Sequence, residues 1–256
     1  MFKILIPFIL IMLSGCLSQP STEPTKKPEK TNKKMFEQED SLIMFALRAE
    51  QIKDYVSAAR IFDTLYEKSN RKEYLYKSLQ NSLYLKENEV VISKIDSITS
   101  DSLDDFILIR LKIVALIQLN RVEEAQTLAI NLVEKSKAVN DYILVSDIYT
   151  SHKKFDIALK YLESAYLREY SERILDKMSI ILYVDLNRKK DAIAQLETHT
   201  RVHGCSVLIC KRLISIYSNE DNVEGLLSAY LRYYQIDSKP EIAKKIVTFF
   251  LEQLEN

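Results

Sequence analysis

The stretch that decides the fold is Tyr142–Ala165, YILVSDIYTSHKKFDIALKYLESA. Its small or apolar side chains stand at Tyr142, Val145, Ser146, Tyr149, Phe155, Ala158, Leu162 and Ala165. These offsets place one apolar stripe on each of two short helices, which a tight turn joins. Because a lone hairpin cannot bury both stripes, the stretch predicts neighbouring hairpins of the same shape.

The hairpin recurs along the chain at a nearly constant interval. Alignment on the small residue near the start of each second helix selects Ala58, Val91, Ala125, Ala158, Ala192 and Gly225. The successive intervals are 33, 34, 33, 34 and 33 residues. A period near 34 with this helix–turn–helix pattern resembles the tetratricopeptide repeat (TPR) over about residues 39–236. The resemblance implies an all-α fold, a right-handed superhelical solenoid of about six TPR-like hairpins.

The repeats also depart from the family's pattern. The family's glycine at the eighth position and its proline at the thirty-second are absent from every copy. In the fifth copy, Asp176 and His199 stand where apolar residues are expected, and in the sixth Gly225 replaces the packing alanine. The sequence therefore predicts the number of hairpins more directly than the angles at which neighbouring hairpins pack.

A final helix follows the sixth copy. Ser238 and Pro240 are typical of a helix start, with serine as a cap and proline in the first turn. We expect residues 238–256 to form a C-terminal capping helix. Its apolar residues, Ile242, Ile246, Phe249 and Phe250, are expected to lie over the sixth hairpin.

The N-terminus has the pattern of an export signal. A positively charged start at Lys3 is followed by an apolar run over residues 4–13 and by LSGC at residues 13–16. A run this short, ending in small residues, is typical of a secretory signal. LSGC resembles the lipobox of bacterial lipoproteins, which implies cleavage before Cys16, lipidation of Cys16 and palmitate-type acylation of the new terminus. Because Leu17 follows, the resemblance implies the outer membrane, facing the periplasm. The alternative is a plain signal peptide with an incidental cysteine.

Residues 16–37 are expected to form a flexible, lipid-anchored tether. Prolines, serines, threonines and lysines dominate this range, which has too little apolar surface to fold. Its lysines either contact anionic lipid head groups or are simply solvated. The predicted organisation is thus a signal peptide over 1–15, the tether over 16–37, the repeat domain over 38–237 and the capping helix over 238–256.

Composition excludes several classes of function. The chain has 36 basic and 36 acidic residues, so it lacks the basic surplus of a nucleic-acid binder. Only three glycines occur, and no proline lies between Pro28 and Pro240. The sequence contains no glycine-rich phosphate loop, no HExxH and no glycine-framed serine. We therefore predict a protein that is not an enzyme and that uses no cofactor and no metal.

The resemblance implies that the first helix of each hairpin lines a concave groove. The groove-facing residues in that register are Tyr76, Gln80, Tyr84, Arg110, Val114, Ile143, Asp147, Lys177, Ile181, Ile214 and Tyr217. Tyrosines and apolar residues with scattered charge suit a peptide or a partner helix. The alternative for each residue is that it packs or faces water. Some family members clamp a terminal carboxylate with Lys and Asn, but no Asn occupies the ninth-position slots here, so that clamp is not supported.

Two cysteines remain after Cys16. In an exported protein a close pair usually forms a disulfide, and Gly204 and Ser206 place Cys205 just before a helix, where the backbone can bend toward Cys210. The alternative is a metal site from His199, His203, Cys205 and Cys210. Its spacing fits no standard zinc pattern.

These observations predict a lipid-anchored periplasmic adaptor that binds a protein or peptide through its groove. By resemblance, lipoproteins of similar build include pilotins of type IV pili, the repeat lipoprotein of the β-barrel assembly machine and adaptors for periplasmic peptidases. Assembly of an envelope machine is therefore the leading function, whether pilus, secretion, motility or outer-membrane assembly. The alternative is a non-catalytic accessory subunit of an envelope enzyme, such as a peptidase or cell-wall hydrolase complex.

Overall fold

The computed structural model describes residues 30–98 and 105–254 of the 256-residue chain. The helices are α1 (Lys30–Gln51), α2 (Tyr55–Ser69), α3 (Lys72–Tyr84), α4 (Asn88–Ile98), α5 (Phe106–Gln118), α6 (Val122–Ser136), α7 (Val139–Ser151), α8 (Phe155–Arg168), α9 (Glu172–Ile180), the π-helical segment η2 (Ile181–Asp185), α10 (Lys189–His203), α11 (Val207–Asn219), α12 (Val223–Ile236) and α13 (Pro240–Leu254). Within these ranges no strand occurs. The predicted signal peptide and Cys16 lie outside the described residues.

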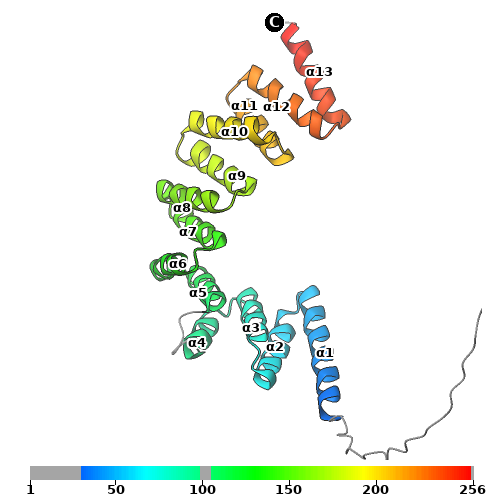
Figure 1. The fold of residues 1–256 in the computed structure, drawn as a ribbon, viewed down its shortest axis with the longest axis vertical. Helices are drawn as coiled ribbons and strands as arrows, with labels where there is room; N and C mark the ends of the chain where they lie inside the picture. Colours follow the sequence, from blue (N-terminus) through cyan, green and yellow to red (C-terminus); the bar gives the residue numbers. More distant parts are fainter. Residues whose placement is uncertain (1–29, 99–104, 255–256) are drawn as a thin grey trace, which may run out of the picture.

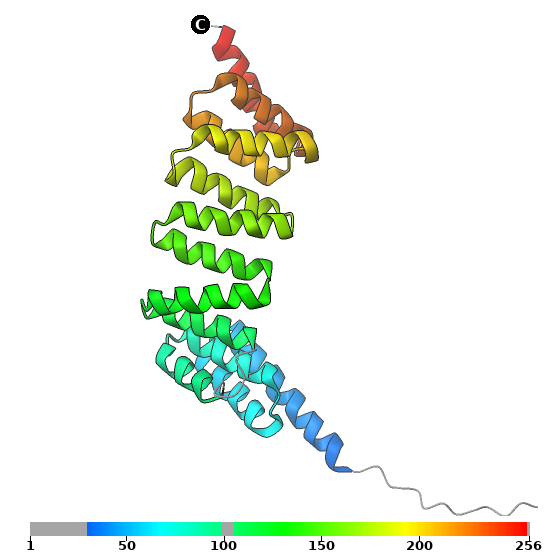
Figure 2. The ribbon, with the colours of Figure 1, turned by 60° about the vertical axis from the view of Figure 1, so that its left-hand side comes forward.

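The helices pair into six successive hairpins, from α1–α2 to α11–α12, and α13 follows the last of them. Figure 1 shows the hairpins stacked along a curved path, so that the ribbon forms a crescent. In the turned view the helices from α6 to α10 lie one above another (Figure 2). The predicted all-α solenoid of helical hairpins is confirmed.

The aligned small residues hold the hairpins together. Ala58, Val91, Ala125, Ala158 and Ala192 are all completely buried. Each lies at the fourth position of its helix, where a small or short side chain lets the first helix of the hairpin approach closely. The interval of 33 or 34 residues therefore reflects one packing contact that is repeated in each hairpin.

The turns inside the hairpins are made without glycine. In each of them one residue adopts the left-handed conformation, with φ between 51° and 63°: Lys53, Lys86, Asn120, Lys153, Asn187 and Asp221. In the fourth hairpin, the amide N–H of the next residue, Lys154, then donates to the carbonyl of Tyr149 at 2.9 Å and closes the end of α7. Asparagine and aspartate adopt this conformation readily, whereas lysine does so at a cost.

Lys153→Gly should therefore stabilise the protein by about 0.5–1 kcal/mol, because glycine adopts positive φ without a steric penalty. Urea denaturation of the variant and the parent measures this difference. Lys160→Gly, at an exposed position within α8, is the matched control and should destabilise by about 1 kcal/mol. A loss of stability in both variants would contradict the account of the turn.

Helix α1 begins at Lys30, inside the range that was expected to be tether. Residues 30–37 have a helical backbone, whereas the repeat domain was expected to start at residue 38. Lysine, methionine, glutamine and glutamate are good helix formers, and no proline follows Pro28 here, so the helix extends toward the N-terminus. No helix in the described part of the chain is both long and apolar enough to cross a membrane.

The fifth hairpin carries one extra residue in its first helix. There α9 contains 9 residues and η2 a further 5, whereas α3, α5, α7 and α11 contain 13 each. A π-helical turn is the usual way in which a helix accommodates a single insertion. The insertion changes the register of the side chains that follow it.

The capping helix α13 covers the sixth hairpin with only one of its two phenylalanines. Ile242 and Ile246 are buried with Cys210 and Tyr233, while Phe249 is half-buried. Phe250 is 48% exposed, so the expectation that it packs on the hairpin is wrong. Adjacent helical residues point about 100° apart, and both rings cannot face the same hairpin.

Candidate partner-binding cleft

A large hollow lies between α7 and α9, the first helices of the fourth and fifth hairpins. Its volume is about 1230 Å³. The residues that line it are Lys137, Ala138, Val139, Asn140, Ile143, Arg168, Glu169, Ser171, Arg173, Ile174, Asp176, Lys177 and Ile180. We call it the α7–α9 cleft. Of the predicted groove residues, Ile143 and Lys177 line it.

The α7–α9 cleft carries more positive than negative charge. Four of its lining residues are basic and two are acidic, and one of the acids is already neutralised, because Asp176 accepts hydrogen bonds from Arg212 at 2.6 and 3.2 Å. Arg168 lies over the ring of Tyr142, 4.8 Å from its centroid. Among the described residues, Lys137 and Arg173 have no acidic partner. The cleft therefore presents unpaired cations beside the apolar side chains of α7 and α9.

Arg110 was predicted to contact a partner, but the structure places it in a contact between hairpins. Its Nε and Nη2 donate to the two carboxylate oxygens of Asp141 at 2.6 and 2.7 Å. The Asp141 side chain is only 1% exposed. Burial opposes its ionisation, but hydrogen bonds from Arg110 and Ser136 outweigh burial and hold the pKa of the Asp141 carboxyl below its ordinary value. The Arg110 guanidinium thus binds Asp141 through Nε and Nη2, while its side chain is 35% exposed, and its contact with a partner stays a prediction.

Other predicted groove residues also pair neighbouring hairpins. Lys177 donates to Asp147, both at exposed positions. The Tyr76 hydroxyl donates to Asp105 at 2.7 Å, where Lys72 also donates at 2.9 Å. Burial and this hydrogen bond raise the pKa of Tyr76 to about 12.

The other residues predicted to face the groove differ in how far the structure exposes their side chains. Ile181 and Tyr217 are only 4% and 6% exposed, so neither presents a face to a partner, and both assignments are wrong. Ile181 opens the π-helical segment, where the extra residue turns it into the core, and the Tyr217 ring packs against Gly225. Val114 and Ile214 are half-buried and pack against the core, while Gln80 and Tyr84 are exposed.

Sequence reasoning missed the basic residues at the edge of the cleft. Lys137 follows the end of α6, Arg168 is the last residue of α8 and Arg173 lies in the first turn of α9, so none of them occupies a groove slot of a first helix. The signal that could have found them is the basic residues near the two junctions that flank the cleft, at residues 135–137 and 168–173. For the ion pairs between hairpins, the signal was two opposite charges about one repeat apart, such as Arg110 and Asp141.

The two departures in the fifth hairpin serve contacts with its neighbours. Asp176 pairs with Arg212 of α11, as described above. His199 is 5% exposed and its ring stacks on Tyr170, with centroids 5.6 Å apart. A polar residue at each position thus joins the fifth hairpin to the hairpins on either side.

The sulfur atoms of Cys205 and Cys210 are bonded, at 2.06 Å. Cys205 lies before α11, which begins at Val207 and is capped by Ser206, as the sequence indicated. The described residues contain no group of three or more His, Cys, Asp or Glu side chains arranged to hold a metal ion.

Comparison with known proteins identifies the fold. No protein-family model and no curated protein matches the chain. Solved structures do match: yeast Tom70 superposes with a TM-score of 0.60 at 16% identity, over 84% of this chain and 47% of Tom70. Pseudomonas aeruginosa PilF superposes with a TM-score of 0.55 at 12% identity, over 83% of this chain and 97% of PilF. YrrB, described as a TPR protein with an unusual peptide-binding site, gives 0.49 at 13% identity, over 75% of this chain and 100% of YrrB.

The chain has the fold of a TPR solenoid. In the TPR solenoid α7 and α9 are both first helices, so the α7–α9 cleft spans two consecutive TPR hairpins. Ion pairs that join TPR hairpins occupy several of the charged positions on the first helices. In the α7–α9 cleft, the two cations that lack an acidic partner among the described residues, Lys137 and Arg173, lie at the junctions between hairpins.

Proposed function

We propose that this chain is a lipid-anchored adaptor of the outer membrane that holds a partner protein in the periplasm, in assembly of an envelope machine. The observation that carries the binding part of the proposal is the basic α7–α9 cleft. The proposed location is supported by LSGC at residues 13–16, in which Cys16 is the proposed site of lipidation.

The size and shape of the cleft favour a polypeptide segment over a small molecule. Small-molecule sites usually enclose about 300–1,000 Å³. The α7–α9 cleft, at about 1230 Å³, is larger and runs across two hairpins. Side chains of Val139, Ile143 and Ile180 offer apolar contacts between its polar edges. A partner segment in the cleft thus gains both apolar and polar contacts.

The charge of the cleft favours a segment that bears carboxylates. Lys137 and Arg173 lie at its edge and lack an acidic partner among the described residues, so an Asp or Glu side chain of the partner would pair with them. Guanidinium and ammonium groups form charge-assisted hydrogen bonds with carboxylates, which fix orientation as well as adding affinity. The partner segment is therefore acidic and partly apolar.

The bond between Cys205 and Cys210 supports an oxidising compartment. Such bonds form and persist in the bacterial periplasm and are rare in the cytosol. Cys210 is completely buried and packs with Tyr233, Ile242 and Ile246, so the bond anchors the start of α11 close to the capping helix. It stabilises the C-terminal end of the solenoid by about 2 kcal/mol on the chain-entropy estimate for a short loop.

Charge reversal tests the cleft. Lys137→Glu combined with Arg173→Glu should abolish capture of the partner that the parent chain retains after in-cell crosslinking. Neither residue has a charged partner among the described residues, so the helical circular dichroism should be unchanged. The matched control is Lys68→Glu with Lys160→Glu, two exposed residues on second helices.

Retention of the partner by the cleft variant, together with its loss in the control, would show that another face binds. The anchor is tested separately by Cys16→Ser, which should move the chain from the membrane fraction to the soluble fraction. Unchanged fractionation and processing of Cys16→Ser would refute lipidation without bearing on the cleft.

A further inference from the structure

Helix α13 continues the repeat pattern beyond the sixth hairpin. Its apolar residues come 33 positions after those of α11, the interval of the repeat: Ile242, Ile246, Val247, Phe249 and Phe250 follow Ile209, Leu213, Ile214, Ile216 and Tyr217. The helix thus has the residues of the first helix of a seventh hairpin. Among the described residues, no second helix follows it.

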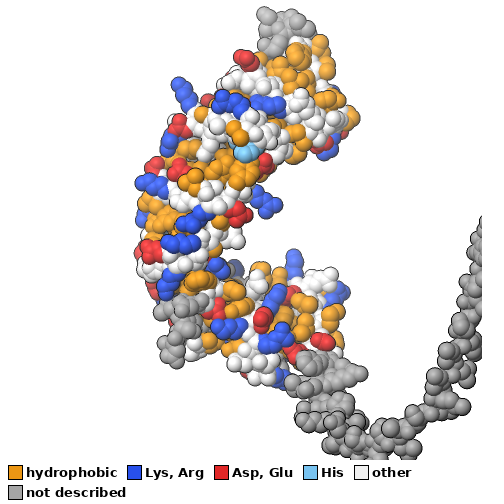
Figure 3. Space-filling view, viewed as in Figure 1, with side chains coloured by type: hydrophobic (Ala, Val, Ile, Leu, Met, Phe, Trp, Pro, Cys, Tyr) orange, Lys and Arg blue, Asp and Glu red, His pale blue; other side chains and the backbone are white. Residues whose placement is uncertain are grey.

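One part of the apolar stripe of α13 is exposed, although its counterparts in other hairpins are buried. The eleventh residue of α5, α7, the combined α9 and η2, and α11 is Leu116, Tyr149, Leu182 and Tyr217, none of them more than 7% exposed. The eleventh residue of α13, Phe250, is 48% exposed, and its neighbours Val247 and Leu251 are 56% and 55% exposed. Figure 3 shows hydrophobic side chains over α12 and α13 at this end of the crescent. A solenoid end that met only water would present polar residues here.

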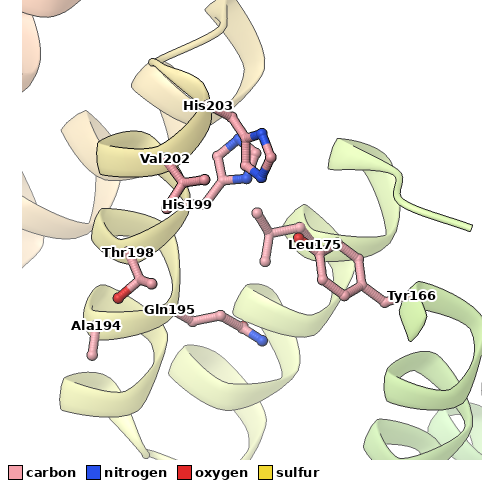
Figure 4. A pocket seen from close by; sticks show the side chains of 8 residues that line it. All are labelled: Tyr166, Leu175, Ala194, Gln195, Thr198, His199, Val202 and His203. Atoms are coloured by element: carbon pink, nitrogen blue, oxygen red, sulfur yellow. The ribbon is translucent and has the colours of Figure 1, made fainter.

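In the complete hairpins this stripe lies against the second helix. In the sixth, the ring of Tyr217 lies so close to Gly225 of α12 that a Cβ atom there would come within 2.6 Å of it. In the fifth, Leu175, the fourth residue of α9 as Ala243 is of α13, points toward α10, the second helix of that hairpin (Figure 4). The two helices of a hairpin run antiparallel. The exposed stripe of α13 therefore fits an antiparallel helix that presents a small residue to Phe250.

We infer that α13 of a second copy of this chain packs on the stripe, so that two copies share a seventh hairpin about a twofold axis. A twofold axis at right angles to two paired helices makes them antiparallel, which is their orientation within a hairpin. With the axis at Val247, Ala243 of one copy lies opposite Phe250 of the other, as Gly225 lies against Tyr217 in the sixth hairpin. Small side chains thus face large ones on both sides of the axis, so the stripe is complementary to itself.

The charges beside the stripe allow two copies to meet. Lys244 is exposed at its edge, and the twofold axis places it beside Leu251 of the other copy, toward the C-terminal end of that helix. The negative end of a helix dipole favours a cation there, and the lysine stem lies on the leucine. The two Lys244 side chains lie on opposite sides of the axis, so like charges are kept apart. The stripe shares no residue with the α7–α9 cleft, so the inference goes beyond the proposed function and can fail without it.

Engineered cysteines test the twofold pairing in the full-length chain with Cys16→Ser, in which Cys205 and Cys210 are bonded to each other. Val247→Cys places two thiols at the axis and should give a disulfide-linked dimer on mild oxidation. Phe250→Cys alone should give none, because antiparallel pairing holds its two copies about 9 Å apart along the helices, beyond the reach of a disulfide. A mixture of Phe250→Cys and Ala243→Cys should give a linked dimer. Lys160→Cys, at an exposed position of α8, is the matched control and should give none.

Sedimentation equilibrium measures the association itself. The Cys16→Ser chain should be a dimer, and Val247→Glu, which brings two carboxylates together at the axis, should raise the dissociation constant of the dimer at least about a hundredfold. Thr248→Glu adds the same charge at an exposed position outside the stripe and should leave that constant unchanged. Circular dichroism verifies that both variants are folded.

Four results would overturn the inference. They are a Cys16→Ser chain that stays monomeric, a dimer that Val247→Glu does not weaken, a disulfide between two copies of Phe250→Cys, and a disulfide that joins Val247→Cys in cells to a different protein instead of a second copy.

Discussion

Arg110→Ala should lower the free energy of unfolding by about 3 kcal/mol at pH 7, the largest loss expected from any single charged residue on the first helices. The side chain of Asp141 is 1% exposed and its two oxygens accept from Arg110 at 2.6 and 2.7 Å. Removal of the guanidinium leaves a buried carboxylate with only the Ser136 hydroxyl. Urea denaturation at pH 7 measures the loss. Lys177→Ala is the matched control: its pair with Asp147 is exposed, and its loss should cost less than about 1 kcal/mol.

The pH dependence separates this account from a simple loss of packing. The folded pKa of Asp141 lies below its ordinary value of 3.8, so the pair stabilises the protein above that pH, and its contribution is lost as pH falls through the folded pKa. Once Asp141 is protonated, it no longer needs Arg110. The difference in stability between the parent and Arg110→Ala should therefore shrink as pH falls from 7 toward 3. A difference that stays constant across this range would contradict the role given to the pair.

Gly225→Ala should destabilise the protein by about 2 kcal/mol, although alanine is the residue that the repeat pattern favours at this position. A Cβ atom here would lie 2.6 Å from two ring carbons of Tyr217. That ring is 6% exposed, and its hydroxyl donates to Glu197 at 2.7 Å, so it cannot move aside without breaking a buried hydrogen bond. Thermal or urea denaturation measures the effect. The higher helix propensity of alanine, about 1 kcal/mol, opposes the clash and is smaller.

A double variant isolates the clash. With Tyr217→Leu in place, Gly225→Ala should cost at least 1 kcal/mol less than it does in the parent, because the residues are in contact and their effects are coupled. Ala158→Gly at the equivalent position of the fourth hairpin should also destabilise the protein, since that alanine is completely buried. An increase in stability on Gly225→Ala would show that Tyr217 does not hold this space.

The number of the hairpins followed from the sequence because it depends on local patterns. Five of the six aligned residues are completely buried, as expected, and Pro240 begins the capping helix. The positions of Cys205 and Ser206 before α11 also follow from local sequence alone. Each of these features is set by one helix or one turn.

The details that could not be predicted depend on contacts between hairpins. Arg110 and Asp141 are 31 residues apart, and nothing within one copy of the repeat shows that they meet. Ile181 is buried because one extra residue creates the π-helical turn, a change of register that the constant period conceals. The cleft's free cations lie at junctions, where the TPR resemblance assigns no binding role.

The central claim is that the α7–α9 cleft holds the partner, and site-specific photocrosslinking in living cells tests it most directly. A photoreactive residue at Asn140 or Arg173 of the cleft, both exposed, should give an adduct with one partner, which mass spectrometry then identifies. The same residue at Lys68 or Lys160 on second helices should give none. The result that would contradict the account is an adduct with that partner from Lys68 or Lys160 and none from the cleft.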